Sequence, residues 1–236
     1  MTQPRIVLIH SPFVGPSTLA PVARTLRGLG WDVAEPQRAA PQDVEPPYYP
    51  GLAKRIASQV EADAHSPLVI IAHSGAGGLL PSVAGAFGSR VSAAILVDAI
   101  LPHPGRSWFQ TAPRELAAYL RAAAADGRLP PWHRWLPFEV LVRLLPDEPV
   151  RAAFCAELEA VPAAYCDEPA PVCANWSPPG CGYLQLSDSY ADEAGAASAM
   201  GWLFRRDIIH HLATLTHPDR VAASLHSMIR ALTDSP

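Results

Sequence analysis

The sequence predicts an α/β fold in which a mostly parallel sheet of about six strands carries helices on both faces. Short apolar runs rich in β-branched residues alternate with amphipathic stretches along most of the chain. Residues 68–72 are apolar at every position, which is typical of a strand buried on both sides. A turn of small residues follows this run, and a helix can begin there.

Each element follows from its own pattern. Strands are predicted over residues 5–9, 31–34, 68–72, 92–97, 182–187 and 202–205. Helices are predicted over residues 18–29, 51–64, 190–199 and 218–232, and directly after the turn at 73–76. The first of these helices has apolar residues three or four positions apart, and Gly30 follows its end.

The alternation of strands and helices breaks between residues 106 and 180. Helical stretches near 113–126, 137–145 and 148–160 are separated by prolines, and no pattern of a buried strand occurs between them. We therefore expect a core made of residues 1–105 and 181–236, with residues 106–180 inserted as a helical lid. A chain of 236 residues is long enough for one such domain.

Composition argues against several classes of function. The formal net charge is −4 and there is no run of Lys or Arg, so we expect no nucleic-acid partner and no anionic membrane partner. No apolar run reaches the length of a transmembrane helix, and the N-terminus leads into a strand without a signal-peptide pattern. The sequence therefore predicts a cytoplasmic protein. Its oligomeric state stays open.

Cofactors and metals are not expected either. The chain has no glycine-rich nucleotide-binding motif. The spacing of its four cysteines fits no zinc site, so free thiols are expected at Cys155, Cys166, Cys173 and Cys181.

Residues 72–76 read Ala-His-Ser-Gly-Ala and have the character of a nucleophile elbow. In such a turn, a strand ends in a serine flanked by small residues, and the side chain is lifted at the carboxyl edge of the sheet beside a helix N-terminus. The usual pattern is Gly-x-Ser-x-Gly. Alanine stands at both outer positions here, and its small side chain still permits close packing. Ser74 is therefore the candidate nucleophile.

A serine nucleophile needs a base to take its proton and an acid to hold the tautomer of that base. In this architecture the expected chain order is Ser, acid, His. Asp188 follows one predicted strand and His211 follows the last one, so they fit the order as acid and base. Asp98 also ends a strand and is the alternative acid, and His210 is the alternative base.

At these residues the chain resembles an α/β-hydrolase, closest to small bacterial relatives of the plant methyl esterase and hydroxynitrile lyase group. Residues 7–15, the elbow, residues 96–105 and residues 210–219 carry the resemblance, whereas residues 106–180 show little of it. In that group the catalytic histidine lies seven residues before a proline that opens the last helix, as His211 does before Pro218. The segment after Asp98 resembles one that lines the pocket, which favours Asp188 as the acid.

The resemblance also implies an oxyanion hole with one unusual position. One donor is the backbone N–H of Gly75. The other, in relatives, is the N–H of the second residue after the strand-end histidine, and that residue is Pro12, which has no N–H. Either Phe13 or the Ser11 hydroxyl supplies the second donor, or the hole is weakened.

The pocket is expected between the elbow and the insertion. Aromatic residues concentrated there are its candidate walls, namely Phe13, Trp108, Phe109, Trp132, Trp135 and Trp176. Such walls would select an apolar small molecule.

These features predict a serine hydrolase that cleaves an ester or thioester of an apolar small molecule through Ser74, His211 and Asp188. A lyase, dehydratase or cyclase that uses Ser74 and His211 as acid and base is the main alternative, suggested by Pro12. A binding protein with a vestigial triad is the third reading.

Overall fold

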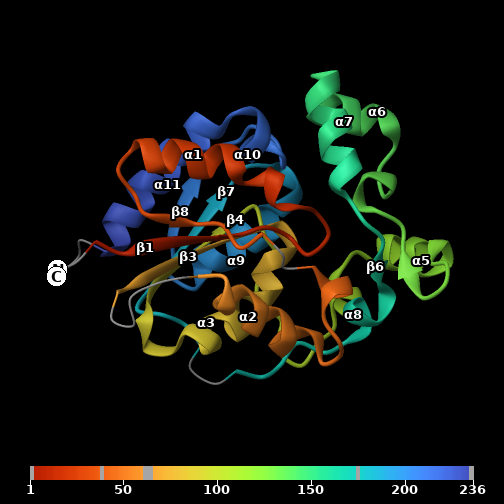
Figure 1. The fold of residues 1–236 in the computed structure, drawn as a ribbon, viewed down its shortest axis with the longest axis horizontal. Helices are drawn as coiled ribbons and strands as arrows, with labels where there is room; N and C mark the ends of the chain where they lie inside the picture. The colour runs from red at the N-terminus through yellow and green to blue at the C-terminus, as the bar shows by residue number, and fades with distance from the viewer. Residues whose placement is uncertain (1–2, 38–39, 61–65, 174–175, 234–236) are drawn as a thin grey trace.

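The computed structural model describes residues 3–37, 40–60, 66–173 and 176–233, and its centre is a six-stranded parallel sheet (Figure 1). The strand order is β2-β1-β3-β4-β7-β8, and every neighbouring pair is parallel. The strands are β1 (Arg5–Ile9), β2 (Val33–Ala34), β3 (Leu68–His73), β4 (Val91–Val97), β7 (Gly180–Gln185) and β8 (Leu203–Arg206). Their carboxyl ends therefore meet at one edge, and the predicted parallel sheet is confirmed.

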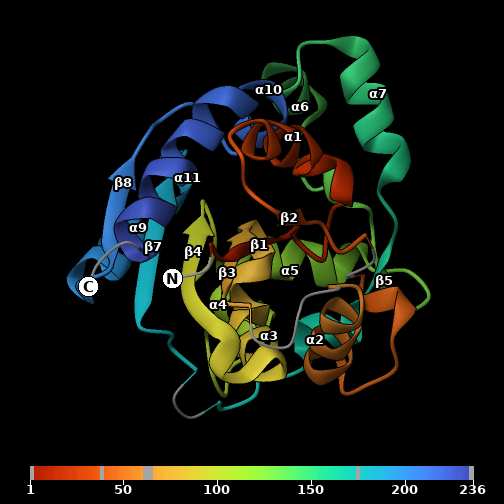
Figure 2. The same ribbon diagram turned by 60° about the vertical axis from the view of Figure 1, so that its left-hand side comes forward.

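Helices cover both faces of this sheet (Figure 2). One face carries α1 (Ala20–Gly28), α10 (Ala213–Thr216) and α11 (Pro218–Thr233), and the other carries α2 (Tyr48–Ser58), α3 (Leu80–Phe87) and α9 (Ala191–Ala199). Alternation along β1 explains the two layers: Ile6 and Leu8 join one buried cluster, whereas Val7 and Ile9 join the other. The helix predicted over 51–64 begins three residues earlier, and its predicted positions 61–64 lie outside the described residues.

The chain between β4 and β7 forms short helices and one small two-stranded sheet. The helices are α4 (Trp108–Thr111), α5 (Arg114–Ala123), α6 (Phe138–Leu144), α7 (Glu148–Glu157) and α8 (Ala163–Asp167). The strands β5 (Arg128–Leu129) and β6 (Val161–Pro162) pair antiparallel, which the sequence analysis did not predict, because strands of two residues leave no alternation to detect. In Figure 1, α6 and α7 stand away from the sheet. That the segment works as a lid stays a prediction.

A carboxylate of this inserted segment caps a helix of the core. Glu168 follows α8 and accepts the backbone N–H groups of Tyr48 and Tyr49, at 2.8 and 3.1 Å. These groups belong to the first turn of α2, where Pro47 at the N-cap offers no polar side chain. A negative charge there satisfies unpaired donors and complements the helix dipole.

We expect Glu168→Ala to lower the free energy of unfolding by about 1–2 kcal/mol, because two N–H groups at the start of α2 lose their acceptor. Chemical denaturation followed by circular dichroism measures this change. The matched control is Glu159→Ala, whose exposed carboxylate accepts from the Gln42 amide at 3.0 Å. The control should change stability by less than about 0.5 kcal/mol. Equal effects of the two substitutions would contradict the capping role.

Candidate active site

The candidate nucleophile lies at the turn between β3 and α3. Ser74 begins a 3₁₀ helix, Ser74–Leu79, and has a φ of 58°, a left-handed backbone that non-glycine residues seldom adopt. Small residues make this turn possible, because a Cβ on Gly77 would run into the carbonyl oxygen of Ile100. The small residues that follow Ser74 thus let the turn pack closely against the neighbouring chain.

Ser74 lies at one end of a chain of hydrogen bonds between three side chains. Its Oγ is 3.0 Å from Nε2 of His211, and Nδ1 of His211 is 2.8 Å from Oδ2 of Asp98. His211 follows β8, and Asp98 follows β4, so three strand ends contribute one group each. The structure therefore brings Ser74 and His211 together, with the Asp98 carboxylate on the other side of the His211 ring.

Asp98 is held by its surroundings in the ionised form. It has no solvent exposure, and its two oxygens accept the backbone N–H groups of Leu186 and Ser187, the Ser187 hydroxyl and the His211 ring. Burial alone would raise the pKa of Asp98. The hydrogen bonds from His211, Ser187 and Leu186 outweigh burial, so this pKa lies below its usual value.

The prediction of Asp188 as the acid beside His211 is wrong. Its side chain is 76% exposed and pairs with Arg206, with 3.1 Å between Nη2 and Oδ1. After β7 the backbone N–H groups of Leu186 and Ser187 donate to Asp98. The chain then turns into a 3₁₀ helix that begins at Asp188. This turn directs the Asp188 carboxylate to solvent at the rim of the site.

His210 does not replace His211. Its Nε2 lies 2.9 Å from the Thr216 hydroxyl, and its ring packs edge-on against His217. The choice between the two neighbouring histidines thus falls on His211, which is the one in contact with Ser74.

Two further rings stack on the His211 imidazole. His73 lies with its centroid 4.9 Å away, and Tyr190 lies 5.0 Å away with only 14° between the planes. His73 Nε2 is also 3.1 Å from the His211 carbonyl oxygen, to which it can donate. Burial, and then the nearby His211, lower the pKa of His73 to about 3. His73 therefore stays neutral and adds no positive charge when His211 takes a proton.

Tyr190 is a site residue that the sequence analysis missed. Its hydroxyl lies 3.4 Å from Ser74 Oγ, within reach of a weak hydrogen bond. It ends the 3₁₀ helix Asp188–Tyr190, just after β7. The available signal was its position, because a residue shortly after a parallel strand lies at the carboxyl edge where sites form.

The loop after β1 presents a hydroxyl to the elbow. Ser11 is buried, and its Oγ accepts the N–H of Phe13 at 3.3 Å. A Cβ on Gly75 would lie 2.8 Å from this Oγ, so the hydroxyl packs directly against the glycine that follows the nucleophile. His10 helps to hold this loop, since its Nδ1 lies 2.9 Å from the Ser11 carbonyl oxygen.

A cavity of about 530 Å³ opens over Ser74. Four of the predicted aromatic walls line it, namely Phe13, Trp108, Trp132 and Trp135. Phe13 contacts Trp108 and Trp135 directly, with ring centroids 5.1 and 4.9 Å apart. The cavity is therefore bounded by aromatic rings from the core loop and from the inserted segment.

Two predicted walls lie elsewhere. Trp176 packs against Trp202, with 6.3 Å between the ring centroids, and does not line the cavity, because it lies at the end of the insertion, shortly before β7. Phe109 is buried behind Trp108, with the Arg121 guanidinium 4.0 Å over its ring.

The titratable groups that line this cavity are two carboxylates, two histidines and the Tyr190 phenol, and no Lys or Arg stands among its described lining residues. The carboxylates are Asp188 and Glu193. Burial, assisted by the negative charges of Asp192 and Asp98, raises the pKa of Glu193. The cavity mouth is thus neutral to acidic.

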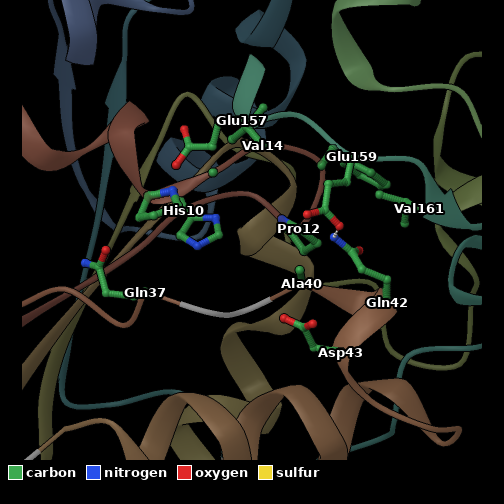
Figure 3. A pocket seen from close by; sticks show the side chains of 13 residues that line it. His10, Pro12, Val14, Gln37, Ala40, Gln42, Asp43, Glu157, Glu159 and Val161 are labelled. Atoms are coloured by element: carbon green, nitrogen blue, oxygen red, sulfur yellow. Dashed lines mark hydrogen bonds between the residues drawn. The ribbon is translucent and has the colours of Figure 1, made fainter. Parts of the chain in front are cut away.

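A second cavity, of about 250 Å³, lies behind the same loop (Figure 3). It is lined by polar groups such as His10 and by Glu157 and Glu159 from the inserted segment, and Phe13 borders both cavities. Glu157 accepts from the backbone N–H and the hydroxyl of Ser17. These bonds fasten the end of α7 to the loop that carries Ser11. Ser74 does not line this second cavity.

In the part of the chain that the structure describes, no grouping of His, Cys, Asp and Glu could hold a metal ion, and the four cysteines are free. Within the same ranges, no helix is both long enough and apolar enough to cross a bilayer.

The chain matches solved protein structures by its fold but matches no known family by its sequence. No family model and no curated protein matches the chain. Solved structures do match: an extracellular α/β-hydrolase from a Paenibacillus species, described as sharing structural and functional homology with tobacco salicylic acid binding protein 2, has a TM-score of 0.76 and 19% identity, and the match covers 95% of this chain and 98% of that one.

Two other matches span both chains almost fully. A pyrethroid hydrolase from Sphingobium faniae JZ-2 has a TM-score of 0.71 and 18% identity, with coverage of 99% and 100%. Tomato methylketone synthase I complexed with 2-tridecanone has a TM-score of 0.69 and 15% identity, with the same coverage. Likeness at these identities shows the fold, which is that of the α/β-hydrolases.

Proposed function

We propose that this chain, which has the α/β-hydrolase fold, is a serine hydrolase that cleaves esters of apolar small molecules through Ser74, His211 and Asp98. One observation carries the proposal: an unbroken chain of hydrogen bonds from Ser74 Oγ through the His211 ring to the buried Asp98 carboxylate. A serine, a histidine and an acid in this relation form an activated nucleophile.

In this proposal each group has its own step. His211 Nε2 takes the Ser74 proton as Oγ attacks the carbonyl carbon, and later gives that proton to the leaving oxygen. Asp98 keeps the other proton on Nδ1 and stabilises the imidazolium that forms. Neutral His73 beside the ring avoids a repulsion between like charges at that moment.

The oxyanion is stabilised by the Gly75 N–H and the Ser11 hydroxyl. Pro12 has no N–H to offer. Ser11 Oγ already accepts from Phe13, so its own proton is free to donate toward the space beside Gly75. A hydroxyl thus takes the place of the missing second amide.

The cavity favours a neutral ester over a thioester whose acyl carrier bears phosphate groups. Aromatic walls bury apolar groups, and the volume of about 530 Å³ suits a substrate of drug size. Asp188 and Glu193 on its lining disfavour phosphate groups of an acyl carrier. A structural neighbour with the same fold is described as a pyrethroid hydrolase.

A fluorophosphonate, which phosphonylates activated serines, tests the nucleophile. We expect one adduct by intact mass on the wild type and none on Ser74→Ala or His211→Ala. The same three proteins should be assayed with a p-nitrophenyl ester, and both variants should lose about 10⁴-fold or more in kcat.

The control for this experiment is Ser189→Ala, which removes a hydroxyl that lines the same cavity but does not contact His211. It should label and turn over like the wild type. A folded wild type that takes no adduct would overturn the proposal.

The second candidate function is a lyase or a related non-hydrolytic enzyme on the same site. Pro12 favours it, because a reaction without a tetrahedral intermediate does not need a second backbone donor. Tomato methylketone synthase I shares the fold and is not described as an esterase. Trapping an acyl adduct on Ser74 during turnover would decide for the hydrolase.

A further inference from the structure

We propose that the Tyr190 hydroxyl is a further catalytic group, which donates a hydrogen bond to the leaving-group oxygen during ester cleavage. This inference rests on the hydrolase function proposed above and adds a preference: esters of ordinary alcohols, whose oxygen leaves poorly, become substrates because of Tyr190.

Tyr190 touches the reacting atom from a fixed position. Its hydroxyl is 3.4 Å from Ser74 Oγ, and its ring stacks on His211 at 5.0 Å with 14° between the planes. The residue joins the 3₁₀ helix after β7 to α9, whose Ala194 and Ala197 are buried against the sheet. The helix that follows Tyr190 is thus anchored to the core.

Sheet order places Tyr190 away from the oxyanion donors. In the order β1-β3-β4-β7, Ser11 follows β1 on one side of the nucleophile, and Tyr190 follows β7 on the other. The carbonyl oxygen faces Gly75 and Ser11, so the remaining oxygen on the same carbon, that of the leaving group, faces the side of His211 and Tyr190.

The direction of the hydrogen bond follows from the protons present. Ser74 directs its own proton to His211 Nε2, so its Oγ can only accept from Tyr190. Burial raises the pKa of Tyr190, and the contact with Ser74 lowers it by less, so the phenol keeps its proton at neutral pH. Tyr190 is therefore a donor throughout.

The step balances without a new proton carrier. Ser74 Oγ forms the bond to the carbonyl carbon, and the bond from that carbon to the alcohol oxygen later breaks with its electron pair on oxygen. His211 delivers to this oxygen the proton that it took from Ser74. Tyr190 shifts its hydrogen bond from Oγ to the alcohol oxygen and keeps its own proton.

A pair of esters with the same acyl group tests this role in Tyr190→Phe. The p-nitrophenolate group leaves readily without a hydrogen bond to its oxygen, whereas the ethoxide oxygen of the ethyl ester must be stabilised as it leaves. We expect kcat/KM for the ethyl ester to fall about 10- to 100-fold, and kcat/KM for the p-nitrophenyl ester to fall less than about 3-fold. The ratio of the two values cancels the amount of folded enzyme, so a partly unfolded variant still gives an answer.

Tyr119→Phe is the matched control. Tyr119 lies on α5, is half exposed, and donates to the Arg134 carbonyl oxygen instead of touching the site. Removing its hydroxyl should change neither ester. The ring at position 190 remains in Tyr190→Phe, so stacking on His211 is preserved and the comparison isolates the hydroxyl.

Three results would overturn the inference. Equal losses for the two esters would mean that Tyr190 merely positions His211, and no loss would mean that its hydroxyl is idle. A wild type that cleaves the activated ester alone would also contradict it. If the wild type cleaves neither ester and takes no fluorophosphonate, the hydrolase function fails as well, and this outcome is distinct from the other three.

Discussion

Asp98→Asn should lower kcat about 10⁴-fold with little change in KM, because the amide forces the wrong tautomer on His211. The Asn oxygen would accept from the backbone of Leu186 and Ser187, as Oδ1 of Asp98 does now. The amide nitrogen would then face His211 Nδ1 and act as a donor. Nδ1 must accept, so Nε2 carries the proton and cannot take one from Ser74.

The matched control is Asp188→Asn, which changes a carboxylate of the same loop region that pairs with Arg206 at the surface. We expect this variant to keep kcat within about 3-fold, since an exposed ion pair contributes little. Steady-state kinetics and thermal melts of both variants separate activity from folding. A large loss in Asp188→Asn together with a near-normal Asp98→Asn would reverse the assignment of the acid.

The choice between these two aspartates shows what the sequence alone could not decide. Asp98 and Asp188 both follow parallel strands, and β4 and β7 are neighbours in the sheet, so both lie at the same edge. The expected chain order Ser, acid, His fits both residues, and the resemblance to α/β-hydrolases favoured Asp188. The actual selection depends on two backbone N–H groups after β7 that converge on Asp98, and no residue pattern announces such a convergence.

The sheet itself was predictable, because it depends on local patterns. Strands buried on both faces have apolar runs, and such runs mark β3 and β4 clearly. The inserted segment was harder to predict. Its two-stranded sheet pairs Arg128 and Leu129 with residues more than thirty positions away, and each strand has two residues. Long-range pairing of this kind leaves no periodic signal.

Pocket walls were predictable in part for the same reason. Phe13 lies shortly after β1, at the sheet edge where the fold places the site, and it lines the cavity together with Trp108 at the start of α4. Trp176 lies on the return path toward β7, where its partner is Trp202. Tyr190 was not predicted because a lone tyrosine after a strand has no distinctive spacing, although its hydroxyl lies 3.4 Å from Ser74 Oγ.

The Ser11 hydroxyl makes the second large prediction. We expect Ser11→Ala to lower kcat about 100-fold while KM changes little, because an oxyanion donor acts in the transition state and hardly at all on the bound ester. Pro12 offers no amide in compensation. Steady-state kinetics with a p-nitrophenyl ester measures the loss, and the rate of fluorophosphonate labelling should fall with it.

Pro12→Ala provides the matched control, because it restores an N–H at the position where the resemblance to α/β-hydrolases places the second donor. Alone it should leave kcat at or above the wild-type value, and combined with Ser11→Ala it should recover part of the loss. Phe13 N–H loses its acceptor in Ser11→Ala, so thermal melts must accompany the kinetics. A folded Ser11→Ala enzyme with kcat within about 3-fold of the wild type would show that the Gly75 N–H stabilises the oxyanion without the hydroxyl, since one lost donor should cost far more.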